Sequence, residues 1–148
     1  MSLKQEIFDK VVIHLLTQNA RSTNETGGSC SYRSKDGKSC AVGCLIEDSE
    51  YSINMEDFTI RDPIMVAWGV SKFGKDDFEE IKPVLRFLQL IHDKIKVERW
   101  NGTLMQCANH FNLEKNVFQH FGDGIDPHPI RSITDFAGII EIYGIYGK

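Results

Sequence analysis

The sequence predicts an α+β fold, a mostly helical single domain with one small β-hairpin around Asp36-Gly37. Two stretches, residues 3–18 and 77–96, repeat apolar residues at three- and four-residue steps, which is the period of an amphipathic helix. Between them lies Asp36-Gly37, a dipeptide typical of a tight hairpin turn. The chain has 148 residues, 41% hydrophobic and 26% charged. This fits one globular domain spanning residues 1–148, because a single core serves roughly 100–200 residues.

Residues 3–18 are expected to form the first helix. Its apolar residues fall on one face: Leu3, Ile7, Phe8, Val11, Val12, Leu15 and Leu16. Ser2 and Gln5 have the Ser-x-x-Gln spacing of a capping box, in which each side chain binds the other residue's backbone N–H. The helix should end before the polar segment 22–28, which finishes with two glycines.

The hairpin prediction rests on a type I′ turn, which needs a positive φ at both central residues and so favours Asp-Gly. If Asp36-Gly37 form this two-residue loop, Arg33 pairs with Cys40, and Cys30 faces Gly43. This register gives no reason to expect a disulfide between Cys30 and Cys40.

The apolar run at residues 41–46 is expected in the core, either as a continuation of the strand or as the start of a short helix, since Gly43 fits both. Residues 47–76 scatter apolar residues among acids, glycines and Pro63, which predicts short helices joined by loops.

Residues 77–96 carry the clearest helical stripe: Ile81, Val84, Leu85, Leu88, Ile91, His92 and Ile95. Proline is tolerated in the first turn of a helix but not in its interior. Pro83 therefore predicts that the regular helix begins close to Ile81. A further helix is predicted at 98–112, a turn at 114–120, and a short apolar helix at 136–143, with a terminal strand as the alternative for the last.

The charge is unevenly distributed. The formal net charge is −4, but residues 47–80 contain ten acidic residues against three basic ones, which is −7. Such a stretch is either an ordinary solvated face or a surface that attracts a basic partner. Mild acidity argues against nucleic-acid binding, which normally shows a basic patch.

No run approaches the ~20 apolar residues of a membrane span, and the first residues lack the basic and apolar segments of a signal peptide. We therefore expect a cytoplasmic protein with no membrane partner. In a reducing compartment, Cys30, Cys40, Cys44 and Cys107 should remain free thiols.

Several short motifs occur in a suggestive order: Tyr32-Arg33, then Asp36-Gly37-Lys38, then the segment from Cys40 to Ile46 (Cys-Ala-Val-Gly-Cys-Leu-Ile), then Leu88-Gln89, and His92-Asp93. With an N-terminal helix before them and Trp100 after them, they resemble a group of small uncharacterised proteins of tailed bacteriophages and of bacteria, where prophages are a source. The resemblance covers about residues 5–113 and leaves 114–148 as a C-terminal extension. It implies an origin, but no activity and no catalytic residue.

The candidate metal ligands are Cys30, Cys40, Cys44 and His92. Cys40 and Cys44 stand four residues apart, so one helical turn would bring their sulfurs to one face, with Cys30 third and His14, His92 or His110 fourth. However, the sequence contains no Cys-x-x-Cys pair and none of the usual zinc spacings. We therefore expect buried structural thiols, with no metal and no cofactor.

A thiol-dependent enzyme is the alternative, with Cys40 or Cys44 as nucleophile and His92 as base. Such a base is normally oriented by a carboxylate. Adjacent helix positions diverge by about 100°, so Asp93 is not expected to orient His92. A histidine on an apolar helix face is more often a hydrogen-bonded core residue.

With no complete catalytic set, the sequence predicts an accessory protein of phage or prophage type that acts by binding another protein. The apolar residues of 114–148 offer a second contact surface or a route to self-association: Phe118, Phe121, Ile139, Ile142 and Tyr146.

Overall fold

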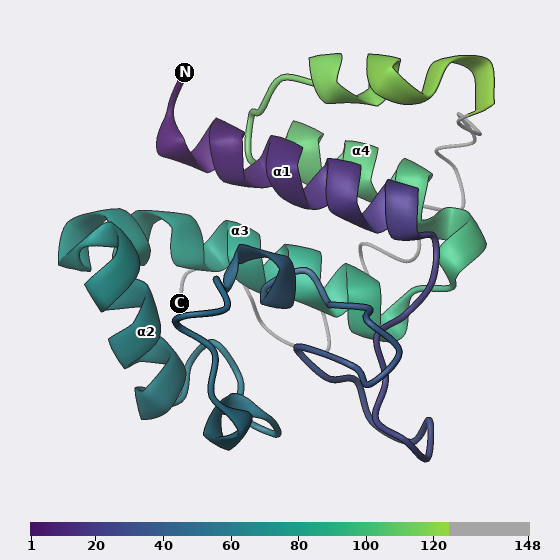
Figure 1. Ribbon diagram of the computed structural model, residues 1–148. Helices are drawn as coiled ribbons and strands as arrows, with labels where there is room; N and C mark the ends of the chain where they lie inside the picture. Colours follow the sequence, from purple (N-terminus) through teal and green to yellow (C-terminus); the bar gives the residue numbers. More distant parts are fainter. Residues whose placement is uncertain (125–148) are drawn as a thin grey trace.

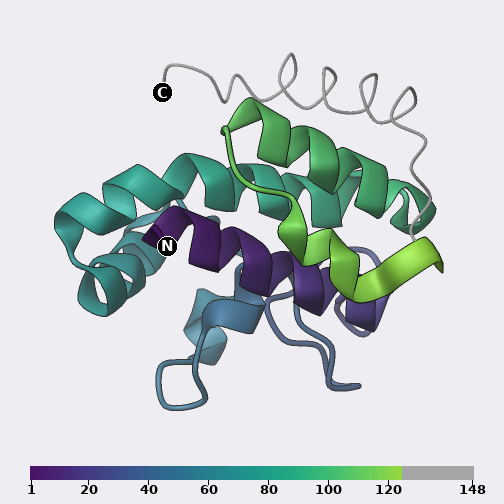
Figure 2. The same ribbon diagram turned by 90° about the horizontal axis from the view of Figure 1, so that it is seen from above.

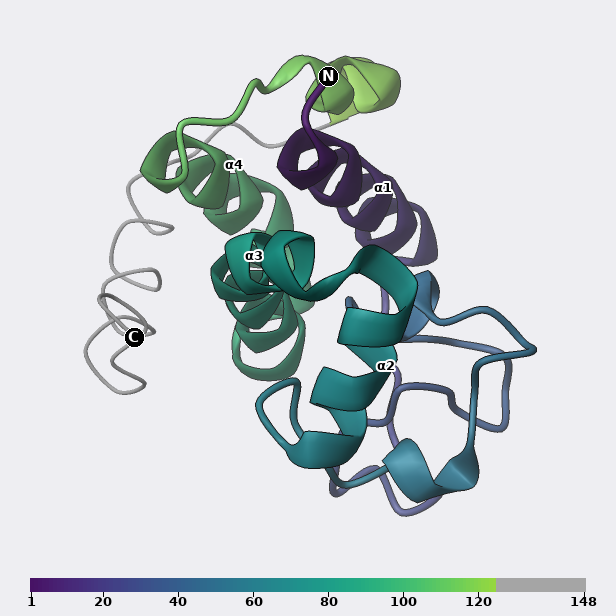
Figure 3. The ribbon, with the colours of Figure 1, turned by 90° about the vertical axis from the view of Figure 1, so that its left-hand side faces the viewer.

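Three helices lie side by side, and a long irregular segment covers part of them (Figures 1 and 3). The computed structural model describes residues 1–124, and this part contains four α-helices: α1 (Leu3–Gln18), α2 (Pro63–Phe73), α3 (Lys75–Lys94) and α4 (Trp100–His110). α3 is the central helix, because it packs against α1, α2 and α4. Four 3₁₀ helices complete the described part: η1 (Gly43–Leu45), η2 (Ile53–Met55), η3 (Val97–Arg99) and η4 (Asn116–Gly124).

The first helix confirms the prediction for residues 3–18. The Ser2 hydroxyl accepts a hydrogen bond from the Gln5 backbone N–H at 3.1 Å, as an N-cap should. The second half of the capping box is missing. Instead the Gln5 side chain is buried, accepts from the Glu114 backbone N–H and donates to the Glu114 carbonyl. It thereby ties the start of α1 to the chain that follows α4.

The central helix begins earlier than predicted, at Lys75 rather than close to Ile81. Pro83 lies inside α3, although an interior proline costs ~3 kcal/mol. The additional turns bury the Phe78 ring completely against α2. There it lies so close to Gly69 that a Cβ on that glycine would be 2.1 Å from the ring. Burying an aromatic side chain and Ile81 contributes ~1.5–3 kcal/mol each, which offsets the proline.

The helix predicted at 98–112 is confirmed as η3 followed by α4. Beyond it, the turn predicted at 114–120 forms the start of η4, which runs along α1 (Figure 2). Phe118 is buried, and its ring meets that of Phe8 edge-on at a centroid distance of 6.2 Å. Val117 and Phe118 therefore pack on the core. The helix predicted at 136–143 lies outside the described residues.

The hairpin prediction was correct in the place of the chain reversal and wrong in its form. Gly37 has a φ of +89°, but Asp36 is not in the positive-φ region, so the turn is not type I′. The Gly37 N–H instead donates to the Ser34 carbonyl and the Ser34 N–H to the Lys38 carbonyl, which makes a three-residue loop. The extra residue shifts the register, so that Arg33 pairs with Ser39 rather than Cys40.

The pairing in this loop amounts to an isolated bridge, and residues 1–124 contain no β-strand. A second isolated bridge joins Thr23 to Cys30, so Cys30 does not face Gly43 as predicted. The fold is therefore a mostly helical domain, and the α+β assignment is corrected. Isolated bridges satisfy few backbone groups, and several others in this segment bond to turn carbonyls or to side chains.

The apolar run 41–46 is in the core as predicted, and its central residues form η1. Gly43 is required here, because a Cβ at this position would be 2.1 Å from the Tyr32 carbonyl oxygen. The prediction of short helices in 47–76 is confirmed by η2 and α2. No helix in the described part combines the length and the apolarity needed to span a membrane.

Candidate functional site

A pocket of about 590 Å³ lies between two loops and α3. The loops contribute residues 28–32 and 56–61, and α3 contributes five residues at three- and four-residue steps: Arg86, Gln89, Leu90, Asp93 and Lys94. This spacing places them on one face of the helix, beside the face that enters the core. The volume falls in the range of ligand-binding sites.

His92 lies beside Cys30 and Asp93 of the pocket lining and is completely buried. Its Nε2 accepts a hydrogen bond from the Ser22 backbone N–H at 3.0 Å, and its Nδ1 lies 2.7 Å from Asp93 Oδ1. Because a backbone N–H only donates, Nε2 carries no proton, and the ring proton is on Nδ1. His92 is thus a neutral imidazole whose two nitrogens are both engaged.

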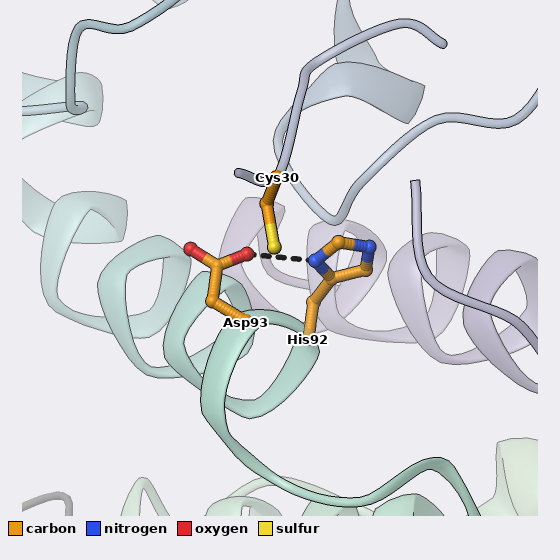
Figure 4. Close-up of side chains that lie close together, drawn as sticks. All are labelled: Cys30, His92 and Asp93. Atoms are coloured by element: carbon orange, nitrogen blue, oxygen red, sulfur yellow. Dashed lines mark hydrogen bonds and ion pairs between the residues drawn. The ribbon is translucent and has the colours of Figure 1, made fainter. Parts of the chain in front are cut away.

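The prediction that Asp93 does not orient His92 was wrong. The two Cβ positions diverge around α3, but Nδ1 is the ring nitrogen nearer the backbone, so the short Asp93 side chain reaches it (Figure 4). The Asp93 Oδ1 atom also accepts from the Gln89 amide at 2.8 Å. The His92-Asp93 motif is visible in the sequence, but only the side-chain rotamers show that the two residues are hydrogen-bonded to each other.

Cys30 approaches this pair from the loop before Tyr32 (Figure 4). Ligand atoms of Cys30, His92 and Asp93 lie within 4.8 Å of one another. Burial, helped by the neighbouring Asp93 carboxylate, raises the pKa of the Cys30 thiol to about 11. The thiol is therefore protonated at neutral pH, and a protonated thiol is a poor nucleophile.

Cys30, His92 and Asp93 each carry an atom of a kind that can coordinate a metal ion. A metal on Nδ1 would move the ring proton to Nε2, where it would point at the Ser22 N–H and break that hydrogen bond. His92 is therefore a poor ligand. Cys30 and Asp93 alone fall short of the four ligands of a structural zinc site. The donor set does not fit a bound metal.

The other predicted thiols are not brought to His92 as a metal-binding group in the described residues. Cys40 lines the pocket but is almost completely buried, and this burial raises the pKa of its thiol well above the ordinary value. The Cys44 thiol donates to the Ala41 carbonyl, and burial raises its pKa to about 12. All four cysteines are free thiols, as predicted. The thiols of Cys40 and Cys44 are therefore protonated at neutral pH, which makes each a poor nucleophile for the thiol-dependent alternative.

Several side chains around the pocket hold backbone in place. Arg21 donates to the carbonyls of His92 and Ile95, which lie at the end of α3 where carbonyls lack helical partners. The Gln89 amide oxygen accepts from the Val42 N–H at 3.0 Å. His92 and its neighbours thus attach the irregular segment to α3, which is a structural role.

Glu56 has a similar role on the opposite wall. Its carboxylate accepts from the backbone N–H groups of Tyr32 and Arg33, and from the Tyr51 hydroxyl. These three donors come from outside the short loop that carries Glu56. Nothing in the sequence around residue 56 indicates this function.

The acidic stretch 47–80 does not form one free surface. Besides Glu56, Glu50 pairs with Lys72 at 3.0 Å, and Asp48 pairs with Arg33 at 2.8 Å. The same region exposes large apolar side chains: Phe58, on the pocket lining, is 49% exposed, and Ile53 is 73% exposed.

Comparison of the chain with models of protein families, with curated proteins and with solved structures found no match.

Proposed function

We propose that this chain is a binding protein without catalytic turnover, and that it receives a segment of another protein in the pocket beside Phe58. The observation that carries the proposal is the combination of a cavity of about 590 Å³ with a half-exposed aromatic ring on its lining. Aromatic side chains are enriched at protein interfaces, where they supply large contact area.

The chemistry of the pocket walls supports binding over catalysis. The Cys30 thiol is protonated at neutral pH, and His92 has no free nitrogen with which to accept a proton from it. No residue of the described pocket combines the exposure and the activation of a nucleophile.

An accessory protein of phage or prophage origin that acts through a protein partner agrees with this proposal. The acidic residues of 47–80 that lack internal partners would assist the approach of a partner with basic regions around its inserted segment. Such steering would weaken as salt concentration rises.

Site-specific photo-crosslinking tests the proposal. A benzophenone amino acid placed at position 58 of the full chain should capture a discrete protein from a bacterial lysate, identified by mass spectrometry. The matched control carries the same group at position 13, where Ile13 is 38% exposed on α1 and away from the pocket lining. Capture from position 58 but not from 13 supports the proposal. Equal capture from both, or none from 58, would contradict it.

A further inference from the structure

The lining of the pocket includes two arginines that form no ion pair with a carboxylate in the described part of the chain. Arg61 comes from the loop before α2 and Arg86 from the α3 stripe, and both line the cavity. Within the described part of the chain, neither guanidinium belongs to an ion pair. Asp57, on the same lining, pairs with neither of them.

The two positive charges act on each other. Partial burial and, after it, the Arg61 charge lower the pKa of the Arg86 guanidinium. Arginine stays charged under these conditions, so the repulsion is not relieved by losing a proton. A bound anion would relieve it.

The other carboxylates on the lining are already used. Glu56 receives two backbone N–H groups and the Tyr51 hydroxyl, and Asp93 Oδ1 receives Gln89 and His92. Their negative charge is therefore stabilised locally by donors other than the arginines, which keep their hydrogen-bonding capacity for a ligand.

We infer that the pocket binds an oxyanion, a carboxylate or phosphate group of its ligand, at the guanidinium groups of Arg61 and Arg86. A guanidinium offers parallel N–H donors that match the two oxygens of such a group, so charge and geometry favour the same ligand class. The inference rests on the proposed binding function and names the chemical group that the partner presents.

Titration of the full chain with two probes, inorganic phosphate and glutarate, tests this by NMR. The Nε–Hε resonances of Arg61 and Arg86 should shift saturably with the probe that fits, and the stronger probe identifies phosphate or carboxylate as the group. In Arg61→Gln and Arg86→Gln the affinity should fall about tenfold or more, because a charge-assisted hydrogen bond is lost. In Arg86→Lys, which keeps the charge but loses the planar guanidinium, the affinity should fall less.

Lys96→Gln is the matched control, since it makes the same change in charge at an exposed residue outside the lining, and it should keep the wild-type affinity. Arg61 is also exposed, so Arg61→Gln tests the inference even if Arg86→Gln disturbs the fold. The absence of a saturable shift, or wild-type affinity in Arg61→Gln, would overturn it.

The two proposals can fail separately. Oxyanion binding without protein capture from position 58 would support the anion site and contradict a protein partner. Capture from position 58 without oxyanion binding would do the reverse.

Discussion

The helices α1, α3 and α4 and the irregular segment 19–62 are stabilised in different ways. The helices meet through apolar faces, and their facing residues are almost completely buried, among them Val12, Leu88 and Leu104. The segment has short 3₁₀ helices and isolated bridges. Several of its backbone N–H groups donate to side chains that are distant in the sequence, namely Glu56 within the segment and Gln89 and His92 of α3.

The two kinds of stabilisation determine how a substitution in each region affects the stability of the fold. In the helical part, stability depends on buried apolar volume, which the local sequence period reveals. In the segment, of which the run 41–46 also enters the core, it depends in addition on single polar atoms that each satisfy a particular backbone group. The pocket lies along the boundary, so its walls combine a rigid helix face with loops held by hydrogen bonds.

The largest effect is expected in the helical part. Leu88→Ala should lower the free energy of unfolding by about 2–5 kcal/mol, because Leu88 is fully buried at the centre of α3 and the cavity cannot refill. Denaturant titration measures this. Leu90→Ala is the control in the same helix, where the side chain is half-buried, and it should cost clearly less. Equal losses would show that the buried face is misassigned.

In the segment 19–62, removing the Glu56 carboxylate alone should lower the free energy of unfolding. Glu56→Ala should destabilise the protein by about 1–3 kcal/mol, because two backbone N–H groups and a hydroxyl lose their acceptor. Asp57→Asn removes one negative charge from the next residue, and the free energy of unfolding should change by no more than about 0.5 kcal/mol. A comparable loss in both variants would point to charge rather than to the hydrogen bonds.

A smaller effect should follow acidification. His14 of α1 donates through Nε2 to the Ser39 carbonyl at 2.8 Å. Burial lowers the pKa of His14 below its ordinary value of 6.5, and the Ser39 hydrogen bond opposes this shift. The unfolded chain therefore binds more protons, so stability should fall as pH drops below about 6.5.

Denaturant titration of wild type and His14→Gln across this pH range checks the expectation. The variant should show a shallower fall. Burial also lowers the pKa of His110 in the same direction, so part of the slope should remain in the variant and disappear in His14→Gln/His110→Gln. An unchanged slope in the double variant would exclude both histidines as its source.

The smallest effect concerns the alkylation rates of the thiols in the two regions, which are measured without any substitution. At about pH 8, Cys30 should react with iodoacetamide more slowly than an ordinary thiol, since raising its pKa from 9.0 to about 11 leaves about 100-fold less thiolate. Cys107, completely buried in α4, should react only when the helices separate. Peptide mass spectrometry over time gives both rates. Rapid labelling of Cys30 would instead favour an activated thiol.

The sequence alone predicted the helical part well. The apolar period located α1 at its observed ends, the turn chemistry located the reversal near Gly37, and the run 41–46 was placed in the core. These features are local, since the residues that determine them stand within a few positions of one another. The start of α3 was missed because the buried contact between Phe78 and Gly69 outweighs the local effect of Pro83.

The residues that come together at the pocket are determined by the tertiary structure. Cys30 was a candidate ligand in the sequence, but its position beside His92 and Asp93 depends on a loop folding onto a helix more than sixty residues later. The partners of Glu56 and the presence of Arg61 and Arg86 on one pocket lining have the same origin. A hydrogen bond between a side chain and a distant backbone group leaves no period in the sequence, whereas a buried helix face must repeat with every turn.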